Sequence, residues 1–125
     1  SGARGDYMPE GGRLVFLNAL PLNAIPLKSF CVTVRRIDLS NPTEVSIFLR
    51  QSSNVVSFIR HEATIEVLNK LLGLGLKPSA ELYQWKEGDE LVIVTLKKPI
   101  RGQEIQDVKP EDLEVFYAYV SRECV

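Results

Sequence analysis

The histidine at position 61 is the side chain best placed for acid–base chemistry. His61 is the only histidine among the 125 residues. It stands at the start of a run whose apolar residues Ile65, Leu68 and Leu72 recur at helical spacing. An imidazole titrates near neutral pH, and the amino end of a helix attracts anions through its free N–H groups and its dipole. The pattern therefore favours chemistry on a phosphate group, with His61 as the proton donor.

Other polar residues follow apolar runs and can complete such a site. Asn18 ends the first apolar run, Arg60 precedes the histidine, and the basic cluster Lys97, Lys98 and Arg101 follows another apolar run. Simpler interpretations stay open: a histidine at a helix start is often a capping or surface residue. Asn18 can end a strand through a local turn, and a basic cluster can protect a sheet edge. The residue types alone do not decide between these roles.

Apolar spacing and turn residues predict the elements that position these side chains. Asn41 is expected to cap a helix and Glu44 to close its capping box. Gly73 and Gly75 are expected to end the helix headed by His61. We expect strands at 13–18, 30–34 and 115–120, a short extended segment at 55–59, helices at 41–50 and from 61, a helical turn at 110–113, and a hairpin of 80–85 with 91–97. This order predicts one α/β domain with a mixed sheet of about five strands and helices packed on it.

Composition excludes several classes of function. With 15 basic and 16 acidic residues the net charge is −1, which disfavours general binding to long nucleic acids. The apolar runs are shorter than the roughly 20 residues that span a bilayer, and no secretory signal is recognised, so we expect a cytoplasmic protein. Residues 1–12 are expected to form a flexible tail before a domain at 13–125. Cys31 and Cys124 lack metal-ligand spacing and are expected to be buried free thiols.

Three motifs together resemble the viral ring nucleases, small proteins of archaeal viruses with bacterial and prophage relatives. They are the strand end Leu17-Asn18-Ala19, the helix start His61-Glu62-Ala63-Thr64, and the segment from Gly88-Asp89-Glu90-Leu91 to Lys97-Lys98-Pro99-Ile100-Arg101-Gly102. The resemblance covers most of 14–120. It implies a two-fold homodimer with a cleft that binds cyclic tetra-adenylate, the messenger of type III CRISPR immunity. It also implies cleavage of that ring without metal or cofactor.

The resemblance assigns roles residue by residue. His61 matches the catalytic histidine and Asn18 matches a residue that lines the ligand site. Arg60 replaces a glycine that the family usually has, and Lys98 replaces a cleft arginine. A lysine keeps the charge of an arginine but loses its bidentate fork. Two further departures are Pro21, where some members place a serine, and Ala80, where some place an arginine.

Three functions are compatible with these residues. The first is a metal-independent nuclease in which the 2′-hydroxyl attacks the adjacent phosphate and His61 protonates the leaving oxygen. The second is a protein that sequesters a cyclic oligonucleotide without cutting it. The third is an interaction protein that uses the same surface for a protein or nucleic-acid partner. Loss of cleavage with retained binding in His61→Ala separates the first from the second.

Overall fold

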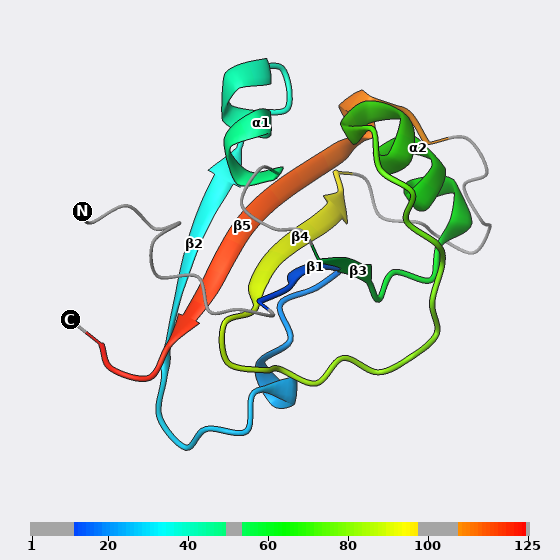
Figure 1. Ribbon diagram of the computed structural model, residues 1–125. Coiled ribbons are helices and arrows are strands. Elements are labelled where there is room, and N and C mark those ends of the chain that lie inside the picture. The colour runs from blue at the N-terminus through cyan, green and yellow to red at the C-terminus, as the bar shows by residue number, and fades with distance from the viewer. Residues whose placement is uncertain (1–11, 50–53, 98–107, 125) are drawn as a thin grey trace.

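The computed structural model describes residues 12–49, 54–97 and 108–124, which form a five-stranded mixed sheet with two α-helices (Figure 1). This confirms the predicted α/β fold. The tail predicted at residues 1–12 lies, except for Gly12, outside the described residues. The elements are β1 (Leu14–Leu17), η2 (Leu22–Ala24), β2 (Cys31–Ile37), α1 (Pro42–Leu49), β3 (Val55–Ser57), α2 (Glu62–Leu72), β4 (Glu90–Leu96), η3 (Pro110–Asp112) and β5 (Leu113–Ser121), where η marks a short 3-10 helix.

The directions of the strands place the carboxyl ends of four of the five strands on the same side of the sheet. The order across the sheet is β2-β5-β4-β1-β3. Strand β1 runs parallel to both β3 and β4, whereas β5 runs antiparallel to β4 and to β2. Strands β1, β2, β3 and β4 therefore all end at the same edge, which we call the carboxyl edge. Ligands of open α/β sheets commonly bind at such an edge.

The two faces of the sheet are covered by different parts of the chain, and the residues of β1 are buried on both faces. All four residues of β1 are buried, because alternate side chains point to opposite faces. Leu14 and Phe16 pack in the core beneath α2, and Val15 and Leu17 pack on the other face. There the cover consists of the chain from 18 to 30 and the loop that precedes β4, joined by a hydrogen bond from Trp85 N–H to Ala24 O of 3.1 Å.

Helix α2 forms because one stripe of its surface is apolar and its carboxyl end is well terminated. Ile65, Leu68 and Leu72 are buried against the sheet, and burying each such side chain stabilises the fold by about 1.5–3 kcal/mol. Gly73 adopts a left-handed conformation with φ +68° and donates to Asn69 O at 2.9 Å. Only glycine adopts this conformation at little cost. The predicted end of the helix is thereby confirmed.

The predicted start of α1 is confirmed in part. Asn41 Oδ1 accepts hydrogen bonds from the N–H groups of Thr43 and Glu44, as an N-terminal cap should. Glu44 does not close the expected capping box: its carboxylate instead accepts the N–H of Asp38 at 2.6 Å. The reason is the turn before the helix, which folds back so that Asn41 N–H is already bound by Asp38 O.

The hairpin predicted from residues 80–85 is wrong. Strand β4 pairs with β1 and β5, and residues 74–89 contain no strand. A buried polar network holds this loop instead. The Asp89 carboxylate accepts two hydrogen bonds from the Arg13 guanidinium, at 2.9 and 2.7 Å, one from Tyr83 at 2.5 Å and one from Lys86 N–H at 3.0 Å. Because Arg13 precedes β1, the network attaches the loop to the amino end of β1.

The expectation of two free thiols is also wrong, because Cys31 and Cys124 form a disulfide with a Cα separation of 5.5 Å. The cause is strand register: β2 and β5 are antiparallel, and Cys31 lies opposite Ser121. The chain then needs only three more residues to bring Cys124 to its partner. Disulfides persist in oxidising compartments and in intracellular proteins of hyperthermophiles.

The expected strand at 30–34 is observed as β2, shifted toward the carboxyl end. β2 is an outer strand of the sheet, and its residue Val34 is 47% exposed. In the described segments, neither helix is long and apolar enough to cross a bilayer.

Candidate functional site

Asn18, Arg60 and His61 all follow the carboxyl ends of two paired strands, β1 and β3. Phe16 of β1 pairs with Ser57 of β3, and Phe58 N–H donates to Phe16 O at 2.9 Å. Asn18 therefore leaves β1 next to the place where the chain leaves β3 toward Arg60 and His61. Asn18 and Arg60 are exposed and His61 is half-buried.

The connection from β3 to α2 is fixed on both sides, which gives His61 a defined place. Ser57 Oγ accepts the N–H of Ile59 at 3.1 Å. Ile59 is 1% exposed, and its carbonyl accepts the N–H of Ser79 at 2.9 Å. A buried anchor two residues before His61 thus sets where the helix begins.

His61 is held at the helix start by its own helix. Its backbone is extended, with φ −75° and ψ 111°, and its carbonyl accepts the first helical hydrogen bond, from Ile65 N–H at 3.2 Å. The imidazole Nδ1 lies 2.7 Å from the Oγ1 of Thr64, a buried residue one helical turn on. Nδ1 is therefore engaged by a side chain of the same helix.

The amino end of α2 is suited to an anion. No side chain of the described residues caps it, so the first N–H groups of the helix carry the positive end of the dipole without a competing acceptor. Arg60 adds a positive charge at this end, whereas Glu62, in the first turn, adds a negative one. Both side chains are exposed, so solvent and salt screen their influence on a bound phosphate.

Lys97 lies at the same edge but farther along it. Leu17 pairs with Ile93, so β4 extends beyond the end of β1, and Lys97 lies three residues past the level of Asn18, roughly 10 Å along the strand direction. Lys98 and Arg101, the other members of the predicted basic cluster, lie outside the described residues. Lys97 is exposed, and its N–H donates to Asp112 O at 2.9 Å.

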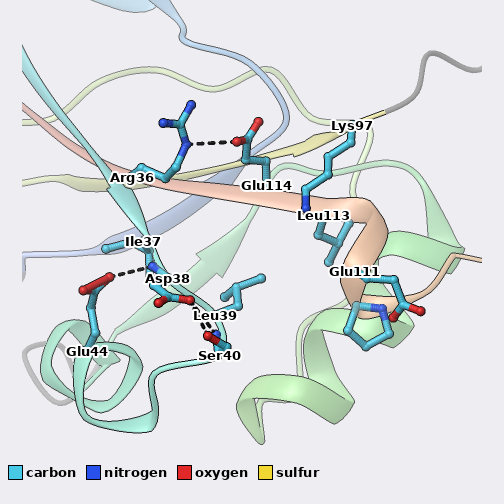
Figure 2. A pocket seen from close by; sticks show the side chains of 11 residues that line it. Arg36, Ile37, Asp38, Leu39, Ser40, Glu44, Lys97, Glu111, Leu113 and Glu114 are labelled. Carbon is cyan, nitrogen blue, oxygen red and sulfur yellow. Dashed lines mark hydrogen bonds and ion pairs between the residues drawn. The ribbon is translucent and has the colours of Figure 1, made fainter.

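The hollow beside Lys97 carries more negative than positive charge, as Figure 2 shows. Its volume is about 500 Å³, and its ionisable lining consists of Arg36, Lys97, Asp38, Glu44, Glu111 and Glu114. Arg36 Nε is paired with the Glu114 carboxylate at 2.9 Å, and hydrogen bonds from the Ser40 hydroxyl and N–H lower the pKa of Asp38. Its acidic lining repels phosphates, so this hollow does not fit a polyanion.

A second hollow of about 500 Å³ lies beside β3, between that edge strand and the loop at 74–81. Neither hollow is lined by His61 or Asn18.

Neither Pro21 nor Ala80 has a polar side chain. Pro21 opens η2, and its carbonyl accepts the N–H of Ala24 at 3.0 Å. It offers no side-chain donor where some ring nucleases have serine. Ala80 lies exposed in the loop before β4 and offers no charge.

Sequence reasoning missed two side chains that shape the site. Ser57 orients the connection that precedes His61, and Thr64 binds the imidazole. Thr64 had a signal in the sequence, because residues three apart are neighbours on a helix. The Ser57 contact depends on how β3 ends, which the spacing of residues does not specify.

A family model matches this chain, and its fold is similar to that of a solved structure. A family model described as STIV B116-like matches residues 14–120. Among solved structures, the chain is similar to B116 of Sulfolobus turreted icosahedral virus, with a TM-score of 0.66 and 17% identity, over 86% of this chain and 99% of that one. No curated protein matches the sequence.

Proposed function

We propose that this chain, which belongs to the STIV B116-like family, is a metal-independent ring nuclease for cyclic tetra-adenylate. In this proposal it works as a homodimer in the cytoplasm and antagonises type III CRISPR signalling. The observation that carries the proposal is the imidazole of His61 at an uncapped helix start, which follows β3, the strand paired with the β1 strand that precedes Asn18. An acid at a helix end that favours anions is suited to protonating the leaving oxygen of a phosphodiester.

The reaction needs no group beyond the ligand and the protein. The ribose 2′-oxygen attacks the adjacent phosphorus, the new P–O2′ bond forms as the P–O5′ bond breaks, and the 2′-hydroxyl proton passes to water. His61, as the imidazolium, gives its proton from Nε2 to the leaving 5′-oxygen. The helix amino end and Arg60 stabilise the charge that develops on the phosphate oxygens. Each cut leaves a 2′,3′-cyclic phosphate and a 5′-hydroxyl.

A second copy of the chain is part of the proposal because the resemblance to ring nucleases implies a homodimer. A two-fold pair would present two His61 side chains to a ring that itself has rotational symmetry. Two equivalent cuts would then release two linear di-adenylates.

A sequestering protein is the second candidate, and a specific observation favours it. Arg60 is exposed directly before His61, where the ring nucleases usually have glycine. A bulky cation there can hold a phosphate and at the same time keep it from the geometry of in-line attack.

Incubation of the purified chain with radiolabelled cyclic tetra-adenylate in EDTA tests the proposal, with cyclic hexa-adenylate alongside. We expect conversion to di-adenylate that carries a 2′,3′-cyclic phosphate. Tight binding without products would favour sequestration, and the absence of both would leave an interaction protein. Sedimentation of the protein with and without ligand tests the homodimer.

A further inference from the structure

We propose that Thr64 is a positioning residue that fixes the ring of His61 and makes Nε2 the nitrogen that exchanges protons. The proposal begins from the 2.7 Å contact between Thr64 Oγ1 and His61 Nδ1. Its effect on catalysis rests on the proposed nuclease function, but its effect on the imidazole does not.

The helix backbone sets this contact. His61 is the residue just before α2, and Thr64 lies three positions later, on the same face. Thr64 is 5% exposed, so its hydroxyl is shielded from competing water, whereas His61 is half-buried. A β-branched side chain has few allowed rotamers in a helix, which keeps the hydroxyl in place.

The chemistry of the charged ring assigns the direction of the hydrogen bond. An imidazolium has two N–H donors and no acceptor, so in the acid form Nδ1–H must donate to Thr64 Oγ1. A threonine hydroxyl in a helix can place its own hydrogen on a carbonyl of the preceding turn, which leaves its lone pairs available.

The same bond persists through proton transfer. When Nε2 gives its proton to the leaving oxygen, the hydrogen on Nδ1 stays where it is, and the neutral ring remains bound to Thr64. Nε2 then takes up a proton from water to restore the acid. Without the hydroxyl, the remaining hydrogen of the neutral ring can move to Nε2, which changes the tautomer. The ring can also turn over about its bond to Cβ, which takes Nε2 and its proton away from the reacting side.

The experiment uses the fact that His61 is the only histidine of the chain, so its ring nitrogens give unambiguous signals in ¹⁵N NMR. Thr64→Val removes the hydroxyl and keeps the shape, and Thr64→Ser keeps the hydroxyl. At a pH where the ring is neutral, we expect the Nδ1–H tautomer to predominate in the wild type and in Thr64→Ser, and Nε2–H to gain in Thr64→Val. An equal tautomer ratio in wild type and Thr64→Val would overturn the proposal.

Cleavage of cyclic tetra-adenylate gives the second readout. We expect kcat to fall about 10- to 100-fold in Thr64→Val, with KM unchanged, and Thr64→Ser to recover most of the rate. If the wild type cleaves and Thr64→Val has the wild-type kcat, the positioning role is wrong although the nuclease function stands. If the wild type does not cleave, the nuclease function fails, and the tautomer measurement still decides the role of Thr64.

Discussion

Replacement of Asp89 by asparagine should destabilise the fold far more than replacement of Glu87, although both carboxylates pair with an arginine. The Asp89 side chain is 1% exposed and accepts four hydrogen bonds, two of them from Arg13. The Glu87 side chain is 61% exposed, and it meets Arg122 at 2.8 Å through a guanidinium that is 59% exposed. The two pairs thus differ in access to water.

The expected magnitude follows from that difference. Removal of one partner of a buried ion pair costs about 3–5 kcal/mol, because the other charge is left without compensation. The Arg13 side chain is 14% exposed, so water reaches part of the guanidinium, and we expect the lower end, about 3 kcal/mol, for Asp89→Asn. For Glu87→Gln, in an exposed pair, we expect less than about 1 kcal/mol.

Urea unfolding followed by circular dichroism measures both changes with the disulfide intact. The urea concentration at the midpoint of unfolding should fall sharply for Asp89→Asn and stay near that of the wild type for Glu87→Gln. The slope of the unfolding free energy against urea concentration should be the same in all three proteins. If the two variants lost equal stability, the network around Asp89 would not be what holds the loop at 74–89 to the start of β1.

Three further changes test other parts of the fold. Cys31→Ser, which breaks the bond to Cys124, should lower the free energy of unfolding by about 2–4 kcal/mol and Tm by roughly 10 °C, measured by calorimetry; reduction of the wild type should have the same effect. Gly73→Ala should cost about 1 kcal/mol, because its φ is +68° although a methyl group meets no atom within 4 Å; Gly75→Ala, which has equal space and no positive φ, is the control in urea unfolding and should be nearly neutral. Burial, and then the hydrogen bond to Asp89, raise the pKa of Tyr83, so as the pH rises the unfolded state loses the tyrosine proton first, near pH 10. Above that pH the free energy of unfolding should fall faster for the wild type than for Tyr83→Phe, by up to about 1.4 kcal/mol per pH unit.

The elements that the sequence predicted well depend on local signals. Four consecutive apolar residues predicted β1, helical spacing predicted α2, and the left-handed glycine that ends α2 was recognisable as Gly73. The cap at Asn41 was equally local. Each of these features is specified by residues within a few positions of one another.

The features that the sequence analysis missed depend on distant residues. Arg13 and Asp89 are 76 positions apart, and their pairing turned the expected arm of a hairpin into a loop. The disulfide joins residues 93 positions apart and follows from the register of β2 and β5. Spacing along the chain carries no information about either pairing.

The candidate site also has residues that the sequence indicated and surroundings that only the fold revealed. The residue type of His61 and its place at a helix start selected it, and the resemblance to ring nucleases added Asn18; both residues follow strands that end at the carboxyl edge. The acidic surroundings of Lys97 became visible only with the fold, because they come from the turn after β2, from α1, from η3 and from β5.

The single-turnover rate of cyclic tetra-adenylate cleavage in EDTA, measured for the wild type and for His61→Ala at saturating protein, tests the central claim most directly. Lys70→Ala, an exposed change on the same helix, is the control. We predict that His61→Ala binds the ring as tightly as the wild type but cleaves it at least about 100-fold more slowly, with Lys70→Ala unchanged. Equal rates for His61→Ala and the wild type would contradict the assignment of His61 as the general acid.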